Sequence, residues 1–299
     1  MSARLRAGRR TIQISSPDKV LFGRAKLTKL DLARYYGEVA EVMVPHVRGR
    51  PVTMLSCPQG VEGECHITKA APSHFPPWIQ RATVPKRGGQ VTHVVANDAA
   101  TLAYLAGQNV ITPHVWLSRV DRPQLPDRLT FDLDPPGDRF GDVRAAARAL
   151  GTLLRELGLA PFAMTTGSRG LHVTVPLRRT APFEEVRAFA REVAARLIEQ
   201  HPDRLTLQQR KDKRGDRIFV DVMRNAYAQH AVAPYGVRPL PDAPVAAPLR
   251  WEELDDRRLG PRRYTVRNLP HRLGSEGDPW TGIARRARSV PAALSAGGR

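Results

Sequence analysis

The sequence predicts an α+β fold in which mostly antiparallel central sheets are flanked by helices. Short runs of apolar and β-branched residues recur along the chain, as expected of strands. Two of these runs, 162–166 and 171–177, bracket the turn Gly167-Ser-Arg-Gly170, which is typical of a hairpin. Residues at helical spacing over 143–157 and 186–197 lie between strands. Helices between strands, combined with hairpins, favour α+β over a doubly wound parallel sheet.

The N-terminal third is expected to hold one helix and two strands. Thr28 is a suitable N-cap, with Asp31 at the third helical position. The apolar residues that follow at helical spacing are Leu32, Tyr35, Tyr36, Val39 and Val42. Residues 52–55 and 91–96 are predicted strands, and most of 57–90, which is rich in Pro, His and Gly, is expected to be loop.

The rest of the chain alternates predicted strands and helices. A strand over 129–134 ends at Pro135-Pro136-Gly137, and the helix over 143–157 is closed by Gly158. A further strand is expected over 217–223. We expect a single catalytic domain over 1–299. It would carry an N-terminal extension of about 1–40 and a basic, flexible C-terminal tail of about 284–299.

Composition and net charge indicate the kind of binding partner and the cellular compartment. Hydrophobic residues make up 41% of the 299, enough to bury a sizeable core, and the net charge of +18 indicates a polyanionic partner such as nucleic acid. No run of about 18 apolar residues exists, so no membrane span is expected. Cys57 and Cys65 fit a reducing cytoplasm, which predicts a cytoplasmic, nucleoid-associated protein.

Three carboxylates are the first candidates for chemistry. Asp132 and Asp134 are two residues apart on a predicted strand, so their side chains share one face and repel unless a cation lies between them. Asp221, within another predicted strand, needs a metal or a basic partner if it is buried. Three carboxylates on adjacent strands are typical of a two-metal phosphoryl-transfer site. The alternatives are an exposed strand face for the pair and an ion pair of Asp221 with Arg217 or Arg224.

The hairpin turn is the second candidate. Its two glycines allow backbone N–H groups to approach a phosphate closely, and Arg169 and His172 add side-chain donors. His172 and Thr174 share a strand face, so we expect His172 to project into the same polar groove as the carboxylates. The alternative is an ordinary glycine-bearing turn.

A zinc cluster of Cys57, Cys65, His66 and His74 is a weaker hypothesis. The spacing between these residues matches none of the compact zinc-binding patterns.

Together these residues resemble the polymerase domain of bacterial end-joining DNA ligase D, within the archaeo-eukaryotic primase superfamily. The resemblance covers nearly the whole chain. The stretches that carry it are 127–135, 166–172, 217–225, 231–238, 243–254 and 277–280.

The resemblance implies a primase-polymerase catalytic core and a nucleotidyltransferase activity. Such an enzyme adds nucleotides, with a preference for ribonucleotides, to DNA 3′ ends at gaps and breaks during non-homologous end joining. It would use two divalent metal ions (Mn²⁺ or Mg²⁺), held by Asp132, Asp134 and Asp221, and NTP or dNTP substrates. The residues implied to bind the nucleotide are His114, Thr166, Arg169, His172, Arg214, Arg224 and Arg238.

The resemblance also implies contacts with gapped DNA and with other repair proteins. Lys69 would bind the 5′-phosphate that borders the gap, with His66 and Ile67 beside it toward the template. The implied partners are DNA ends, gapped DNA with a 5′-phosphate, the Ku end-binding protein and a DNA ligase.

Some positions depart from the family pattern. Thr166 stands where Ser is usual and Arg169 where Lys is usual, and both keep the functional group. Thr112 replaces an acidic residue, and His66 and Ile67 stand where two aromatic residues are common. These departures affect template handling more than chemistry. The alternative functions are a non-catalytic module that binds DNA ends or 5′-phosphates, a primase that makes primers de novo, and a metal-dependent nuclease.

Overall fold

The computed structural model describes residues 2–291. The chain divides into two compact units that each combine separate stretches of sequence. Unit 1 contains the chain up to 121, 230–247 and 264–278, and unit 2 contains 122–229, 248–263 and the chain from 279. The single catalytic domain over 1–299 stays a prediction. Of the predicted C-terminal tail, residues 292–299 lie outside the described residues.

Unit 1 is built on an antiparallel sheet. Its strands and helices are β1 (Ser2–Ala7), β2 (Arg10–Ser15), β3 (Val20–Phe22), β4 (Leu27–Thr28), α1 (Lys29–Glu38), α2 (Ala40–Val47), β5 (Pro51–Ser56), β6 (His66–Thr68), β7 (Arg81–Lys86), β8 (Gly89–Val95), α3 (Ala99–Gly107), β9 (Val110–Trp116), β10 (Ser118–Arg119), β17 (His230–Val232) and α6 (Leu269–Glu276). The strand order is β17-β9-β5-β8-β7, with β6 paired to β5.

The N-terminal helix forms as its sequence predicts but ends early. Thr28 and Asp31 make a reciprocal capping box at the start of α1. The predicted continuation through Val42 is wrong, because the chain bends at Val39, and α2 starts at Ala40. The predicted N-terminal extension is thus structured in unit 1, where β1 and β2 pair as a hairpin.

Most of 57–90 is loop, as predicted, but the stretch also contains two strands that were not predicted, β6 and β7. β6 pairs with β5, and β7 pairs with β8 through six residue pairs. The hairpin between β7 and β8 turns at Gly88 and Gly89, whose φ angles of 76° and 148° suit glycine. β7 contains Pro85 but is at the edge of the sheet, where proline is tolerated.

Cys57 and Cys65 form a disulfide bond, which corrects the expectation of two reduced thiols. Ser56 pairs with His66 across β5 and β6, so the cysteines next to them are brought to a Cα–Cα distance of 4.2 Å. Both thiols are thereby removed from any zinc cluster with His66 and His74. The cytoplasmic, nucleoid-associated location loses this support and stays a prediction. Among the described residues, no helix is both long and apolar enough to cross a bilayer.

Unit 2 holds a second sheet with two long helices. Its strands and helices are β11 (Arg122–Pro126), β12 (Arg128–Asp134), α4 (Phe140–Glu156), β13 (Phe162–Thr165), β14 (Leu171–Pro176), α5 (Phe183–Gln200), β15 (Leu205–Thr206), β16 (Ile218–Asp221) and β18 (Pro248–Leu249), with short 3₁₀ turns η1 (Lys211–Lys213), η2 (Met223–Asn225), η3 (Trp251–Asp255) and η4 (Ile283–Arg286).

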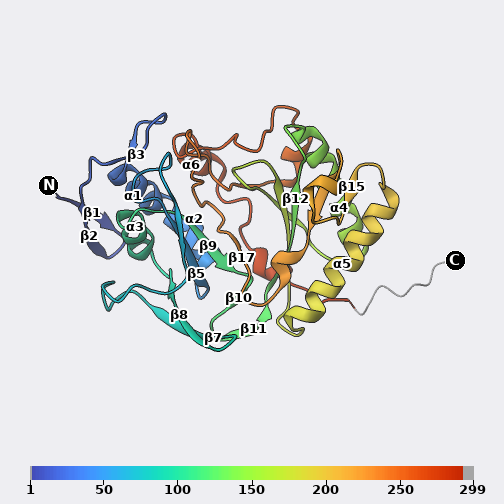
Figure 1. The fold of residues 1–299 in the computed structure, drawn as a ribbon, viewed down its shortest axis with the longest axis horizontal. Helices are drawn as coiled ribbons and strands as arrows, with labels where there is room; N and C mark the ends of the chain where they lie inside the picture. The colour runs from blue at the N-terminus through green and yellow to red at the C-terminus, as the bar shows by residue number, and fades with distance from the viewer. Residues whose placement is uncertain (1, 292–299) are drawn as a thin grey trace. The chain divides into compact units, whose positions relative to one another are not determined.

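The sheet of unit 2 carries the candidate catalytic residues. Its strand order is β15-β16-β12-β14-β13-β18, and all pairings are antiparallel except β15 with β16. Helices α4 and α5 pack against this sheet and against each other (Figure 1). Phe131, Leu133 and Val173 are fully buried, as expected for the apolar side of the sheet. The alternate positions of β12 and β14 are left for polar side chains.

Candidate active site

Strand register brings three predicted site residues together. Asp132 on β12 is the direct partner of His172 on β14 and of Asp221 on β16. Residues that are directly opposite in adjacent strands point to the same face of a sheet, so all three side chains share one face. Asp134, two residues after Asp132, lies on that face where β12 ends. His172 therefore projects from the same sheet face as the carboxylates, as predicted.

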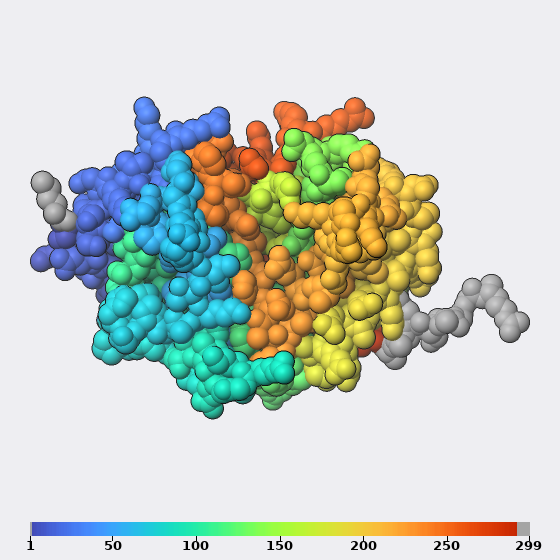
Figure 2. Space-filling view, in the orientation of Figure 1, coloured from blue at the N-terminus to red at the C-terminus, as the bar shows by residue number. Residues whose placement is uncertain are grey.

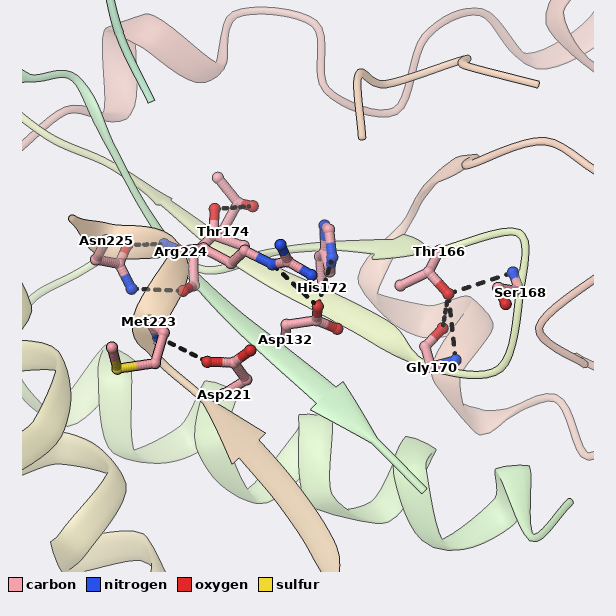
Figure 3. Close-up of polar contacts among 11 residues, drawn as sticks. Asp132, Thr166, Ser168, Gly170, His172, Thr174, Asp221, Met223, Arg224 and Asn225 are labelled. Carbon is pink, nitrogen blue, oxygen red and sulfur yellow. Dashed lines mark hydrogen bonds and ion pairs between the residues drawn. The ribbon is translucent and has the colours of Figure 1, made fainter. Parts of the chain in front are cut away.

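Asp132 lies at the centre of the polar contacts (Figure 3). His172 Nε2 is 3.4 Å and Arg224 Nε is 3.6 Å from the same carboxylate oxygen, Oδ2. The side chains of Asp132 and His172 are almost fully buried, whereas that of Arg224 is 39% exposed. Arg224 can therefore move away from Asp132 without being desolvated.

Asp221 is held by the turn that follows its strand. β16 ends at Asp221, two residues earlier than predicted, and the backbone N–H of Met223 donates a 2.7 Å hydrogen bond to Asp221 Oδ1. Arg217, one proposed ion-pair partner of Asp221, instead donates to the carbonyl groups of Arg214 and Lys213. The ion pair of Arg224, the other candidate, is made with Asp132.

The side chain of Asn225 replaces the strand that β16 no longer provides. Its Oδ1 accepts from Thr130 N–H at 2.8 Å, and its Nδ2 donates to the carbonyl groups of Thr130 (2.8 Å) and Val222 (2.9 Å). Asn225 is fully buried, so these bonds satisfy the edge of β12 beyond the last residue pair with β16. They fix the turn from which Arg224 extends toward Asp132.

The turn between β13 and β14 is closed by Thr166 and packs against the end of β12. The Thr166 hydroxyl accepts hydrogen bonds from Ser168 N–H (3.3 Å) and Gly170 N–H (3.2 Å). A Cβ atom at Gly170 would lie 2.2 Å from the carbonyl oxygen of Leu133 and 3.5 Å from Asp134 Oδ1. Only glycine permits this approach, which places the turn over 166–170 directly beside Asp134.

The carboxylates perturb one another electrostatically. Burial raises the pKa of Asp134 above its ordinary value and Asp132 raises it further, whereas His172 and Arg169 act to lower it. Burial also raises the pKa of Asp221. The hydrogen bond from Met223 opposes that increase, and the charge of Asp132 adds to it. The protein therefore concentrates negative charge on one face at a cost that a bound cation would reduce.

This donor set has the chemistry that divalent metal ions require. Carboxylate oxygens are the preferred ligands of Mg²⁺ and Mn²⁺, and the three aspartates lie on adjacent strands. In residues 2–291 no group of three or more His, Cys, Asp or Glu side chains is already arranged to hold a metal ion. Oδ2 of Asp132 is paired with Arg224 and His172 in this structure. The carboxylates of Asp132, Asp134 and Asp221 therefore fit a divalent metal ion.

Arg214 is near Asp221 but is also used within the chain. Its positive charge acts to lower the pKa of Asp221. Its guanidinium group lies over the Phe219 ring, 3.9 Å from the centroid, and donates to the carbonyl groups of Gln208 and Gln209. These contacts tie the 208–214 loop to β16.

The remaining predicted nucleotide-binding residues, His114 and Arg238, belong to unit 1. His114 lies on β9 opposite Thr53 and Val232, and its ring makes an edge contact with His230 at 5.2 Å between centroids. Arg238 follows a segment anchored to the same strand, because the Thr112 hydroxyl donates to the Val237 carbonyl. The acidic residue that the family usually places at Thr112 is thus replaced here by a structural hydrogen bond.

The loop predicted to contact gapped DNA is a short strand in unit 1. His66 and Ile67 lie in β6, opposite Ser56 and Leu55, and Lys69 follows directly. Ile67 is 62% exposed, which is unusual for a large hydrophobic residue. Pairing with β5 and the disulfide bond both anchor this strand.

Sequence reasoning missed the positioning residues. The sequence shows Asn225 and Gly170 only as parts of motifs. In the structure, Asn225 replaces a missing strand, and Gly170 allows the turn to reach Asp134. β16 has only four residues, too few to show a periodic pattern, and nothing in the sequence marks the Asn225 side chain as buried. The Gly-x-x-Gly spacing of the turn was visible, but the backbone that it approaches was not.

Comparison with known proteins identifies the family and the fold. The family model described as LigD, primase-polymerase domain, matches residues 28–280. The multifunctional non-homologous end joining protein LigD of Mycobacterium bovis is 35% identical over 281 residues, which cover 91% of this chain and 37% of that protein. The bifunctional LigD of Bacillus subtilis is 28% identical and is matched over 94% of this chain and 45% of its own length. The chain thus spans less than half the length of these relatives.

A solved structure shows the same fold. It is the polymerase domain from Mycobacterium tuberculosis ligase D in complex with DNA, with a TM-score of 0.87 and 35% sequence identity. The match covers 92% of this chain and 99% of that one. The predicted α+β primase-polymerase core is confirmed, and the chain belongs to the LigD primase-polymerase domain family.

Proposed function

We propose that this chain is a template-dependent nucleotidyltransferase that adds nucleotides to DNA 3′ ends at gaps and breaks. The observation that carries the proposal is the grouping of Asp132, Asp134 and Asp221 on one sheet face beside the Thr166–Gly170 turn. The family membership supports a polymerase reading of that grouping.

The three aspartates would hold two divalent ions, Mg²⁺ or Mn²⁺. When bound, such ions neutralise charge on the phosphates and lower the energy of a negatively charged 3′ oxygen. The chain contributes the fixed geometry: the paired register of β12 and β16 keeps Asp132 and Asp221 opposite each other before any substrate arrives. Arg224 would leave Asp132 and contact the nucleotide instead.

The other basic residues would bind the nucleotide. Arg169 and His172 would meet the phosphates next to the Thr166 turn, and Arg214 would do so after giving up part of its bonding to the 208–214 loop. His114 and Arg238 are also proposed to bind the sugar and triphosphate, and this part of the proposal rests on the family alone. In the reaction, the primer 3′ oxygen bonds to the α-phosphorus and the bond from that phosphorus to the bridging oxygen breaks. Pyrophosphate leaves with the electron pair, and the hydroxyl proton passes to solvent.

We also propose that the enzyme accepts ribonucleotides at least as well as deoxyribonucleotides and acts in non-homologous end joining. Both statements rest on the family, because no residue contact here selects the sugar. Lys69 would bind the 5′-phosphate across the gap, and the net charge of +18 would favour nucleic acid without regard to sequence. A DNA ligase and the Ku end-binding protein are proposed as partners, because the similar proteins are named as non-homologous end joining proteins.

Primer extension tests the proposal. The chain is given a labelled primer annealed to a template with a gap, Mn²⁺ or Mg²⁺, and ribonucleotides or deoxyribonucleotides in separate reactions. Primer extension that follows the template sequence and stops when a chelator is added supports the proposed activity. Primer shortening would indicate a nuclease, and synthesis without any primer would indicate a primase. DNA binding without either reaction would indicate a non-catalytic module.

A further inference from the structure

A basic hollow lies beside the turn between β13 and β14, because Ser168 and Arg169 of that turn line it. It has a volume of about 350 Å³ and is lined by residues of three loops in unit 2. The lining residues are Gly137, Asp138, Phe140, Ser168, Arg169, Arg258, Gly260, Pro261, Arg262 and Arg263. In the space-filling view the green segment before α4 and the yellow-green turn lie side by side at the surface (Figure 2).

The hollow is strongly positive. Four arginines line it against a single carboxylate, that of Asp138. Arg258 Nε is 3.2 Å from Asp256, but both side chains are exposed, at 86% and 42%, so water and salt weaken this pair. The lining therefore keeps a surplus of positive charge that an anion would balance.

The arginines are held in place by the backbone. Leu259 N–H bonds to the carbonyl of Asp256, and Arg263 N–H bonds to that of Gly260, so two consecutive tight turns carry the arginines. Arg262 Nε donates to the carbonyl of Ser168 at 2.9 Å, which ties the second turn to the 166–170 loop. A guanidinium group fixed through one donor still has other N–H groups to offer, in the planar arrangement that suits phosphate.

Arg169 connects the hollow with the carboxylate site. It lines the hollow, and its charge also acts on Asp134. Arg169 thus places positive charge next to both Asp134 and the hollow.

We propose that this hollow is an anion subsite for a phosphoanhydride chain, which receives the pyrophosphate end of the nucleotide. The inference rests on the proposed nucleotidyl transfer and adds Arg258 and Arg262 to the residues that serve it. A DNA backbone carries one charge per phosphate, whereas pyrophosphate concentrates several charges in a small volume. Four guanidinium groups around one hollow match the concentrated charge of pyrophosphate better than the spaced charges of DNA.

Calorimetric titration of inorganic pyrophosphate into the full chain tests this subsite. A chelator is present, so no metal ion can bridge the anion to the aspartates. Arg258→Gln and Arg262→Gln should each weaken binding roughly tenfold, as expected for loss of a charge-assisted contact. Arg257→Gln, which removes an exposed neighbour outside the lining, should change it by no more than about twofold. Arg258 is the safer position, because its substitution leaves the contact between Arg262 and the turn intact.

The source of the phosphoanhydride is decided by repeating the titration with saturating nucleoside triphosphate. Competition would identify the terminal phosphates of the nucleotide as the occupant, whereas simultaneous binding would show that the hollow does not receive them and would overturn the inference. Unchanged pyrophosphate affinity in both variants would overturn the inference. So would weaker binding of single-stranded DNA with unchanged pyrophosphate affinity, which would make the hollow a nucleic-acid surface. None of these titrations needs polymerase activity, so failure of primer extension is a separate result.

Discussion

Replacing Asn225 with alanine should destabilise unit 2 by more than the loss of one ordinary hydrogen bond would. The amide of Asn225 satisfies the N–H and C=O of Thr130, and it also bonds to Val222. β16 cannot take over, because its last pair with β12 is Asp132 with Asp221, and the chain then turns away. The variant therefore leaves polar backbone groups of a central strand buried without partners.

The size of the effect follows from those groups. Each buried donor or acceptor left unsatisfied costs about 1–3 kcal/mol. Two such groups on Thr130 give a loss of about 2–6 kcal/mol, and a water molecule that enters the vacated space would bring the loss toward the lower end. With a urea dependence of about 2–3 kcal/mol per M, the unfolding midpoint should fall by about 1 M or more.

Urea unfolding followed by circular dichroism and tryptophan fluorescence measures this loss. Asn268→Ala is the matched control, because Asn268 is exposed and accepts a hydrogen bond from Thr265 N–H. Its substitution should cost about 1 kcal/mol or less. If Asn225→Ala unfolds at the same urea concentration as Asn268→Ala, the amide does not replace a strand and the reasoning is refuted.

Three further predictions concern DNA and pH. Lys69→Ala should abolish the preference for gapped DNA with a 5′-phosphate, a contact worth roughly 1.5–3 kcal/mol, and the ratio of affinities with and without the phosphate checks this. Ile67→Phe should tighten binding of gapped DNA by adding an aromatic ring at a position that is 62% exposed, and the affinity for gapped DNA checks this. The affinity for duplex DNA should fall as salt is added, with a slope of log K against log salt concentration of about −0.9 for each neutralised phosphate. A flat response would mean that the positive charge is spread over the surface instead of being gathered at a DNA-binding face. Burial lowers the pKa of His93 below 6.5, so the unfolded chain binds that proton more readily and the free energy of unfolding should decrease as pH falls below about 6.5. His93→Gln should reduce this decrease in urea titrations at several pH values.

The sequence predicted the elements whose signals are local. The capping box at Thr28, the hairpin around Gly167–Gly170 and the two long helices of unit 2 all follow from residue types at fixed spacing. The placement of His172 beside the carboxylates also followed, because alternation along β14 fixes its face.

Features that depend on distant partners could not be predicted. β6 and β7 have few apolar residues, and their pairing is set by β5 and β8 rather than by their own pattern. The disulfide bond depends on that pairing, so the spacing of Cys57 and Cys65 did not reveal it. The ion pair of Arg224 with Asp132, rather than with Asp221, depends on where β16 ends, which Asn225 determines.

Single-nucleotide addition by matched aspartate variants tests the central claim most directly. Asp134→Asn and Asp221→Asn each remove one carboxylate charge from the sheet face, and Asp216→Asn removes the same charge from an exposed position in unit 2. DNA affinity is measured in the same samples, so loss of binding is separated from loss of chemistry. We predict that both site variants lose nucleotide addition while binding DNA as well as the wild type, and that Asp216→Asn keeps both. Near-normal addition by either site variant would contradict the assignment of the three carboxylates to a two-metal catalytic site.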